Sequence, residues 1–221
     1  MKILFLGASS FTGYHFVKQI SKNKTVKIFC TLTQHIHNYK YIRKERINLL
    51  KKIRNVKILS NITFGSRLFI ELIKKEKFDI LCFHYSHTKN YNDDKKFNLK
   101  KAKKENLKNI KLVFNNINNN QKIIISNTIF QQINKKKYAS VNKYGISKTY
   151  NYEIFKKFCL LKKIKYKSIF IPNPWGILEE RKLNYHLIKK WFNNEVPVIN
   201  YPKYIRDNIF ITKLSYEYYK I

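Results

Sequence analysis

A tyrosine and a lysine in the second half of the chain have the residue types and spacing that proton transfer needs. Tyr144 and Lys148 stand four positions apart in VNKYGISKTYNYEIF, so a helix would place both side chains on one face. A neighbouring ammonium favours the phenolate, lowers the pKa of a tyrosine and suits it to acid–base catalysis. The spacing alone is not specific, because seven tyrosines have a lysine four positions later: Tyr14, Tyr85, Tyr91, Tyr144, Tyr152, Tyr185 and Tyr216.

A second candidate site lies near the N-terminus, in the stretch KILFLGASSFTGYHFV. Gly7 and Gly13 follow the first expected strand and open the first expected helix, where backbone N–H groups can hold a pyrophosphate. Gly7 would permit the tight turn, and Gly13 would let the helix pack closely on the strand. Ser10 stands where a third glycine would give the pyrophosphate more room. An ordinary strand-to-helix corner is the alternative, and the elements that follow must decide between them.

Those elements alternate between short apolar runs and longer segments with helical spacing. The runs KILFL, TVKIFCTL, NVKILS, FDILCF, QKIIIS and YKSIFIP are typical of buried parallel strands. Residues 64–77 and 144–163 have helical spacing, and a long charged helix is expected within KNYNDDKKFNLKKAKKENLKN. The pattern predicts an α/β fold of the Rossmann type, a doubly wound parallel sheet. We expect a dinucleotide-binding domain over residues 1–172 and a partial substrate-binding segment over residues 173–221.

The formal charge of +33 would ordinarily suggest a nucleic-acid or anionic-membrane partner. Lysine is spread along almost the whole chain, however, together with many Asn, Ile, Tyr and Phe residues. Compositional drift explains this distribution better than selection for one anionic partner. A nucleic-acid-binding module is therefore the least favoured of the functional hypotheses, although a diffuse positive field would still attract phosphorylated ligands.

Several other classes of protein find no support in the sequence. No signal peptide and no apolar run long enough to span a bilayer is expected. Cys30, Cys82 and Cys159 lack metal-ligand spacing, and His35 and His37 have no ligating partners at metal-binding spacing, so no metal site is expected. We expect a reduced, cytoplasmic protein without a serine nucleophile of the G-x-S-x-G kind.

Taken in order, the motifs resemble those of the extended short-chain dehydrogenase/reductase superfamily, the NAD-dependent epimerase/dehydratase family. The similarity covers nearly the whole chain, and the order of the motifs carries it. GASSFTG resembles the family's glycine loop, FDILCFHYS its fourth strand with His84, and IIISNTIF its fifth strand with Ser or Thr. YGISK is similar to the Tyr-x-x-x-Lys element, IPNPWG to the turn that carries Asn and Gly, and YIRDNIFIT to the Arg-Asp motif.

The resemblance implies a role for each matching residue. Tyr144 would be the general acid/base, Lys148 would hold the nicotinamide ribose and lower the pKa of Tyr144, and Thr128 would orient the substrate. Hydride would pass between the nicotinamide and a carbon of a nucleotide-activated sugar. The implied cofactor contacts are Gly7, Ser9, Ser10, Phe11, Thr12, Gly13, Thr31, Asn61, His84 and Lys148. The implied substrate contacts are Ser126, which is also the alternative to Thr128, Asn173 and Arg206.

Three of these assignments keep an alternative. His84 would be either a cofactor neighbour or a packed histidine at the end of a strand. Asn106 would either match the asparagine of the family's fourth helix or be a solvated helix residue. Arg206 would bind a substrate phosphate or pair with Asp207.

Departures from the family pattern leave the cofactor and the activity open. The second strand ends without an acidic residue for a ribose 2′-hydroxyl, since Thr31 and Thr33 stand there, so NADP fits as well as NAD. Asn61 replaces the usual Asp beside the adenine. Family members generally continue well beyond the Arg206–Asp207 motif, which implies a shortened substrate lobe here, a partner that completes it, or a binding protein without catalysis. A homodimer through helices over residues 97–116 and 144–163 is also implied.

Overall fold

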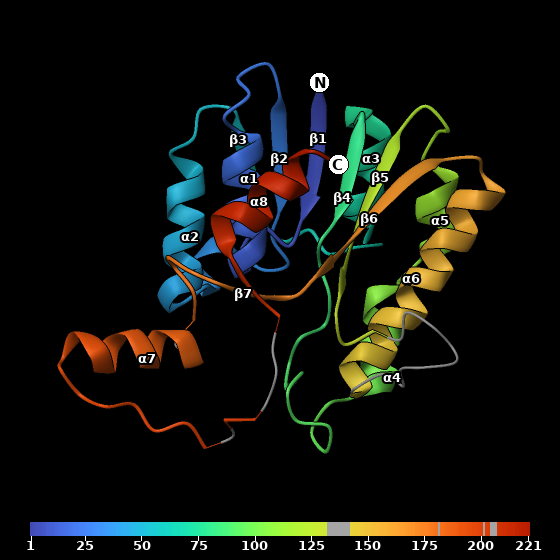
Figure 1. Cartoon of the computed structure of the whole chain (residues 1–221). Helices are drawn as coiled ribbons and strands as arrows, with labels where there is room; N and C mark the ends of the chain where they lie inside the picture. The colour runs from blue at the N-terminus through green and yellow to red at the C-terminus, as the bar shows by residue number, and fades with distance from the viewer. Residues whose placement is uncertain (132–141, 181, 201, 204–206) are drawn as a thin grey trace.

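The computed structural model describes residues 1–131, 142–180, 182–200, 202–203 and 207–221 (Figure 1). A six-stranded parallel sheet with the order β3-β2-β1-β4-β5-β6 forms the centre of the molecule. All six predicted strands are present: β1 (Lys2–Leu6), β2 (Lys27–Thr31), β3 (Val56–Leu59), β4 (Ile80–Phe83), β5 (Lys122–Thr128) and β6 (Lys165–Ile171). The predicted Rossmann-type fold is confirmed.

The order of the strands creates a crevice at one edge of the sheet. β1 pairs with β2 on one side and with β4 on the other, and the register places Leu6 beside Phe83. The chain therefore leaves the ends of β1 and β4 in opposite directions. Ligands of doubly wound sheets bind outside the carboxyl ends of the strands at this switch point.

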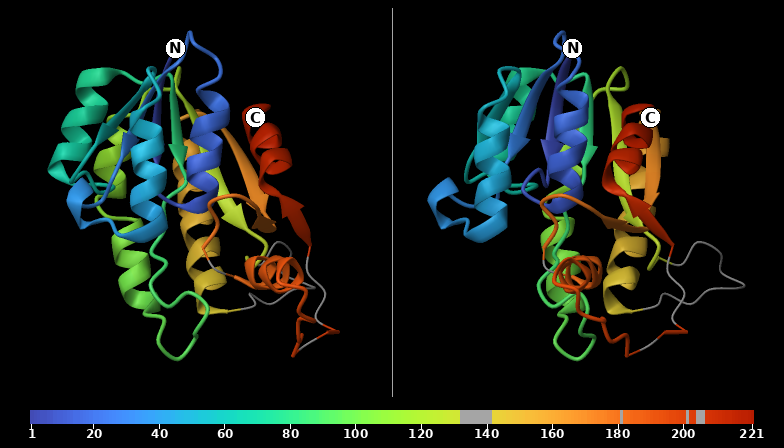
Figure 2. Two further views of the ribbon diagram at one scale, coloured as in Figure 1. Left: turned by 90° about the vertical axis from the view of Figure 1, so that its left-hand side faces the viewer. Right: turned by 60° about the vertical axis from the view of Figure 1, so that its left-hand side comes forward.

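Helices cover both faces of the sheet (Figure 2). On one face, α1 (Phe11–Ile20), α2 (Tyr41–Lys51) and α8 (Ile211–Tyr219) share a core with the sheet, in which Phe16 stacks on Tyr218 at 3.9 Å between ring centroids. On the other face, α3 (Arg67–Glu76), α5 (Ile110–Asn115) and α6 (Lys143–Leu161) enclose a second core. A short 3₁₀ helix, η1 (Ile36–Asn38), precedes α2.

Capping side chains explain where several of these helices begin. Ser10, Ser66 and Asn142 each accept a hydrogen bond from the backbone amide three residues later, so α1, α3 and α6 start immediately after them. The long charged helix predicted from the sequence is shorter than expected. Asn98 caps α4 (Leu99–Asn106), and the residues before it form turns.

The C-terminal part of the chain leaves the sheet and then returns to it. β7 (Asn173–Trp175) pairs in parallel with β8 (Asn208–Phe210), and α7 (Leu183–Phe192) lies between them in the sequence. After β8, α8 packs against α1. The boundary at residue 172 stays a prediction, but α8 shares the core of the N-terminal part. No helix in the described ranges is both long and apolar enough to cross a membrane.

Candidate functional site

A cleft of about 870 Å³ lies at the carboxyl ends of β1, β2, β4 and β5. It brings together residues that are far apart in the sequence, such as Gly7 and Lys148, which are separated by 141 positions. Most of the residues expected to contact cofactor or substrate line it, namely Gly7, Ser9, Ser10, Phe11, Thr12, Thr31, His84, Ser126, Thr128, Tyr144 and Lys148. The glycine loop and the Tyr-x-x-x-Lys element therefore open onto the same space.

The glycine loop is a tight turn in which two positions, Gly7 and Gly13, leave no room for a side chain. Gly7 has a φ of +89°, and a Cβ there would lie 2.6 Å from the carbonyl oxygen of His84. A Cβ at Gly13, which lies behind the cleft in the first turn of α1, would be 2.3 Å from the Gly7 oxygen. These contacts explain the glycines as close approaches between the loop, β4 and α1.

Ser10 does more than reduce the room for a pyrophosphate, because its side chain also joins the two ends of the glycine loop by hydrogen bonds. Its Oγ donates to the carbonyl oxygen of Gly7 at 2.8 Å and accepts from the Gly13 amide at 3.1 Å. The Ser10 amide also donates to the Gly7 oxygen at 3.1 Å. The amides of Phe11 and Thr12, the first two of α1, have no intrahelical acceptor by geometry. They are suited to bind an anionic oxygen in the cleft.

His84 is held in its neutral form at the end of β4. Its Nε2 lies 2.8 Å from the Oγ1 of Thr12, and the rings of Phe5 and Phe16 pack around it. Burial lowers the pKa of His84 to about 3, and the nearby Lys148 charge acts in the same direction. The two interpretations of His84 are thus compatible, because it packs between β4 and α1 and also lines the cleft.

Lys148 forms a hydrogen bond with the backbone near the end of β5, and not with Tyr144. Its Nζ donates to the carbonyl oxygen of Ser126 at 2.6 Å, and burial lowers its pKa to about 8. Because α6 begins at Lys143, Tyr144 lies in the first turn and Lys148 one turn further on. The side chain of Thr128, which ends β5, also lines the cleft.

The pKa of Tyr144 is raised, not lowered as the resemblance implied. Burial is the main cause, the neighbouring Tyr91 adds to it, and a hydrogen bond with Ser86 acts in the opposite direction. The rings of Tyr91 and Phe97 meet that of Tyr144 edge to face, at 5.5 and 6.1 Å between centroids. Desolvation outweighs any effect of the ammonium one turn away, so Tyr144 is a protonated phenol in this structure.

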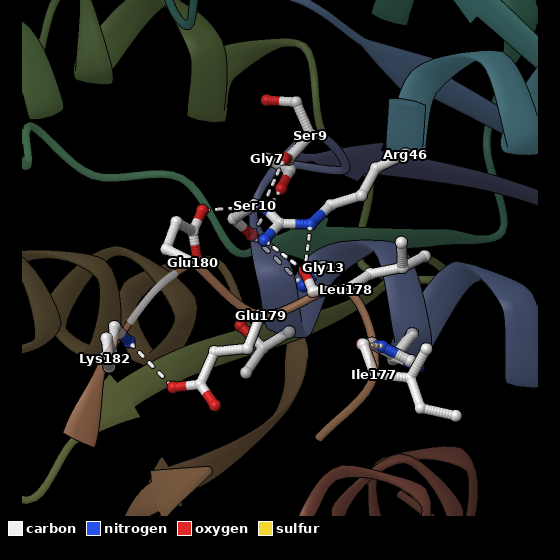
Figure 3. A network of polar contacts seen from close by, with 12 residues as sticks. Gly7, Ser9, Ser10, Gly13, Arg46, Ile177, Leu178, Glu179, Glu180 and Lys182 are labelled. Atoms are coloured by element: carbon white, nitrogen blue, oxygen red, sulfur yellow. Dashed lines mark hydrogen bonds and ion pairs between the residues drawn. The ribbon is translucent and has the colours of Figure 1, made fainter. Parts of the chain in front are cut away.

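A buried arginine that the sequence reasoning missed connects the glycine loop to the C-terminal segment (Figure 3). Arg46 is 0 % exposed. Its Nη1 donates to the Ser9 carbonyl oxygen at 3.2 Å and to Glu180 Oε1 at 2.7 Å, while Nε donates to the Leu178 oxygen at 2.9 Å. Arg46 falls on the same helical face as Ile42 and Leu50. A cation on an apolar stripe was the available signal for a buried ion pair.

The charge of Arg46 also acts on Glu180. Burial alone would raise the pKa of this carboxyl group, but the hydrogen bond and the charge of Arg46 outweigh burial and lower the pKa. A second contact, His15 Nε2 to the Ile177 oxygen at 2.8 Å, lies close by in the same segment. Residues 177–180 are therefore attached to the glycine loop and to α1 through polar contacts.

Besides Gly13, three expected residues do not line the cleft or lie outside the described ranges. Asn61 is exposed in a turn after β3 with a φ of +58°, and Asn173 donates from Nδ2 to Asn208 Oδ1 at 2.5 Å within the small sheet. Arg206 lies outside the described residues, so the choice between its two roles stays open.

Asn106, in contrast, is not a solvated helix residue. It is 2 % exposed, its Oδ1 accepts from the His87 amide at 2.8 Å, and its carbonyl oxygen accepts from the Tyr85 hydroxyl. It therefore fixes the segment that follows β4.

Within the described ranges there is no cluster of three or more His, Cys, Asp or Glu residues that could hold a metal ion.

Comparisons with known proteins agree with this geometry at the level of the fold. No family model and no curated protein sequence matches the chain. Among solved structures, the UDP-glucuronic acid 4-epimerase of Bacillus cereus, in complex with UDP-glucuronic acid and NAD, matches with a TM-score of 0.75 and 14% identity. The match covers 97% of this chain and 71% of the epimerase.

Two further solved structures give the same result. The UDP-glucose 4-epimerase of Thermotoga maritima, with UDP-glucose, matches with a TM-score of 0.74, 16% identity and coverage of 98% of this chain and 71% of that one. The dTDP-glucose 4,6-dehydratase of Bacillus anthracis, with NAD, matches with a TM-score of 0.75, 14% identity and coverage of 98% and 69%. This chain has the fold of these enzymes, and about 30% of each lies outside the match.

Proposed function

We propose that this chain binds a nicotinamide dinucleotide across the switch point of the sheet and acts on a nucleotide-activated sugar. The observation that carries the proposal is the single cleft into which the glycine loop, the end of β5 and the Tyr144–Lys148 pair all open. The proposed reaction class is that of an NAD(P)-dependent epimerase, dehydratase or reductase. The named ligands of the similar structures, NAD with UDP- or dTDP-sugars, support this class.

The residues present fit a dinucleotide. Gly7 and Gly13 stand where a Cβ would collide with backbone, and the first amides of α1 suit a pyrophosphate. The cleft volume lies within the range that is usual for small-molecule and cofactor sites. NAD(P) would supply hydride acceptance and donation at its nicotinamide ring.

The protein's own groups would then handle the protons and the positioning. Tyr144, a protonated phenol, would give a proton from Oη to a substrate carbonyl oxygen, or take one from a hydroxyl in the reverse direction. Lys148 would place its ammonium between the end of β5 and the nicotinamide ribose. Thr128 would orient the substrate with its hydroxyl, and Ser126 is the alternative for that role. Asn173 and Arg206 remain proposed substrate contacts.

The proposal includes a homodimer and a cytoplasmic location. Exposed apolar side chains on α5 and α6, among them Leu112, Ile146 and Leu160, support a homodimer through these helices. Two subunits that meet there would bury apolar surface that one chain leaves in water. We place the protein in the cytoplasm, where nucleotide cofactors and activated sugars are available.

A dinucleotide-binding protein without turnover is the second candidate function. Two observations favour it, namely the raised pKa of Tyr144 and the hydrogen bond that the Lys148 ammonium donates to the Ser126 carbonyl oxygen. In such a protein the cleft would bind the cofactor, but Tyr144 would not exchange a proton. Binding and turnover must therefore be measured separately.

The test compares two tyrosines of α6 that both have a lysine four residues later. Calorimetric titration with NAD⁺, NADH, NADP⁺ and NADPH measures binding, and assays with UDP-glucose, UDP-glucuronic acid and dTDP-glucose measure turnover. We expect Tyr144→Phe to lower kcat roughly 10²–10⁴-fold while the cofactor Kd stays within about twofold. Tyr152→Phe, whose ring packs on Phe170 at 6.2 Å, should leave both values unchanged.

Three outcomes are informative. Loss of turnover in Tyr144→Phe alone supports the enzyme proposal. Binding without turnover of any of the three sugars by the parent protein favours the second candidate. If none of the four dinucleotides binds, both candidates are wrong.

A further inference from the structure

The end of β2 has an unusual chemical character for a dinucleotide site. In NAD-binding Rossmann folds a carboxylate there accepts hydrogen bonds from the adenosine ribose, and its charge repels a 2′-phosphate. Here β2 ends at Thr31, followed by Thr33 and Gln34, and all three line the cleft. The end of β2 thus offers uncharged polar groups in place of the carboxylate.

Two cations face the same part of the cleft. Lys40 immediately precedes α2 and Arg43 lies in its first turn, and both line the cleft together with the residues after β2. Thr33 Oγ1 lies 3.3 Å from the hydroxyl of the buried Tyr39, a contact that holds the loop between β2 and α2 in place. The salt bridges formed among described residues include neither Lys40 nor Arg43.

Among the described residues that line the cleft, no free acidic group balances these two cations. Glu180 is the one carboxylate among the described residues that line it, and that carboxylate is bound to Arg46 at 2.7 Å. Arg46 is already paired with Glu180 and donates its other hydrogen bonds to carbonyl oxygens. An additional anionic group at the end of β2 would therefore meet unpaired positive charge and no repulsion.

We propose that this end of the cleft is a binding site for the 2′-phosphate of an NADP-type dinucleotide. Arg43 is the principal phosphate contact, since a guanidinium can bind two phosphate oxygens at once. Lys40 is the second contact, and the Thr33 hydroxyl can donate a hydrogen bond to a phosphate oxygen. This proposal rests on the proposed function, and it departs from the solved structures described above that contain NAD.

The net charge of +33 makes a particular control necessary. A strongly positive protein attracts any ligand with an extra phosphate, wherever that phosphate sits. Adenosine 2′,5′-bisphosphate and adenosine 3′,5′-bisphosphate carry the same charge and differ only in the position of one phosphate. A preference between them therefore reports a built site rather than the diffuse field.

The experiment titrates NADPH, NADH and the two bisphosphates into the parent protein and two variants at two salt concentrations. We expect NADPH to bind at least about tenfold more tightly than NADH, as one charge-assisted contact implies. We also expect the 2′,5′ isomer to bind more tightly than the 3′,5′ isomer. Arg43→Ala should remove most of both preferences and leave NADH affinity unchanged.

Lys44→Ala is the matched control, because Lys44 is the next residue of α2, is exposed and does not line the cleft. It lowers the net charge by the same amount as Arg43→Ala. Equal losses of NADPH affinity in both variants would overturn the proposal in favour of the diffuse field. So would equal binding of the two bisphosphates, or NADH binding as tight as NADPH.

Failure of the proposed function gives a different pattern. If no dinucleotide binds but the 2′,5′ isomer still binds selectively through Arg43, a 2′-phosphate site is supported, but its assignment to an NADP-type dinucleotide and the oxidoreductase proposal are wrong. If neither the dinucleotides nor the bisphosphates bind, both proposals are wrong. Circular dichroism of each variant confirms that lost binding does not come from lost structure.

Discussion

Two regions of this molecule face the same cleft but are built in different ways. The edge formed by the ends of β1, β4 and β5 is continuous with two buried cores, and Leu4, Phe5 and Phe16 are each 0 % exposed. Among its described residues, the segment over residues 176–210 is attached by the short β7–β8 pairing and by hydrogen bonds to Arg46 and His15. Only Leu178 and Ile209 of these described residues are counted with the apolar core, and both are partly buried. α7 buries none of its residues.

This contrast indicates which interactions stabilise each half of the site. At the sheet edge, apolar burial fixes the backbone, so the groups that would bind a cofactor are positioned in advance. Among the described residues of 176–210, a few polar contacts with net values of about 1 kcal/mol each, together with the apolar packing of Leu178 and Ile209, hold the chain. The cofactor side of the cleft should therefore be rigid, and the substrate side should open at much lower cost.

The largest effect is expected from a methyl group inside the rigid edge. Gly7→Ala places a Cβ at a φ of +89° and 2.6 Å from the His84 oxygen. Backbone strain and overpacking each cost about 1–3 kcal/mol, so the free energy of unfolding should fall by about 2–6 kcal/mol. Urea denaturation measures this loss, and calorimetry should show loss of dinucleotide binding.

Ser9→Ala provides the comparison within the same loop, because Ser9 already carries a Cβ. Its free energy of unfolding should change by less than about 0.5 kcal/mol. If Gly7→Ala were as stable as Ser9→Ala, the loop would be more adaptable than its packing against β4 indicates, and the contrast between the two regions would be lost.

A smaller and local effect is expected from removal of the buried arginine. Arg46→Met should cost about 2–3 kcal/mol, because it leaves the carbonyl oxygens of Ser9 and Leu178 without their donor. Hydrogen exchange should then speed up at the amides of residues 177–180 far more than at those of β1 and β4. Uniformly faster exchange would mean that the segment and the sheet open together.

The same contact predicts a dependence on pH through Glu180. Its folded-state pKa is lowered from the usual 4.5, so the ionised carboxylate stabilises the protein above that pH. This contribution is lost as the pH falls from about 4.5 through the folded-state pKa. Glu180→Gln should therefore be less stable than the parent at pH 7, and the difference should shrink as the pH falls below 4.5.

The smallest effect is expected on α7. Phe192 is 88% exposed, so Phe192→Ser should change the free energy of unfolding by less than about 0.5 kcal/mol. Phe16→Ala, in the core, should cost about 3–5 kcal/mol. Thermal denaturation of the two variants measures the contrast directly. A large loss in Phe192→Ser would show that α7 has a partner in solution, such as a second copy of the chain.

Local patterns were sufficient to predict the sheet and the loop. Six runs of five to eight residues contained the six parallel strands, which are four to seven residues long, and Gly7 and Gly13 became the two close contacts of the first turn. Such features depend on neighbours in the sequence, because hydrophobic periodicity and the absence of a Cβ act locally. The order of the motifs also placed Tyr144 and Lys148 at one cleft with Gly7, 137 or more positions away.

Long-range packing decided the rest. Residue types and their order along the chain were enough to predict which segments form the sheet and which chemical groups lie near its carboxyl edge. Only the tertiary structure showed that Arg46 is buried against residues 177–180, that Lys148 bonds to Ser126 and that the pKa of Tyr144 is raised. Burial, ionisation and hydrogen-bond partners depend on atoms from distant segments, and no spacing within one segment can specify them.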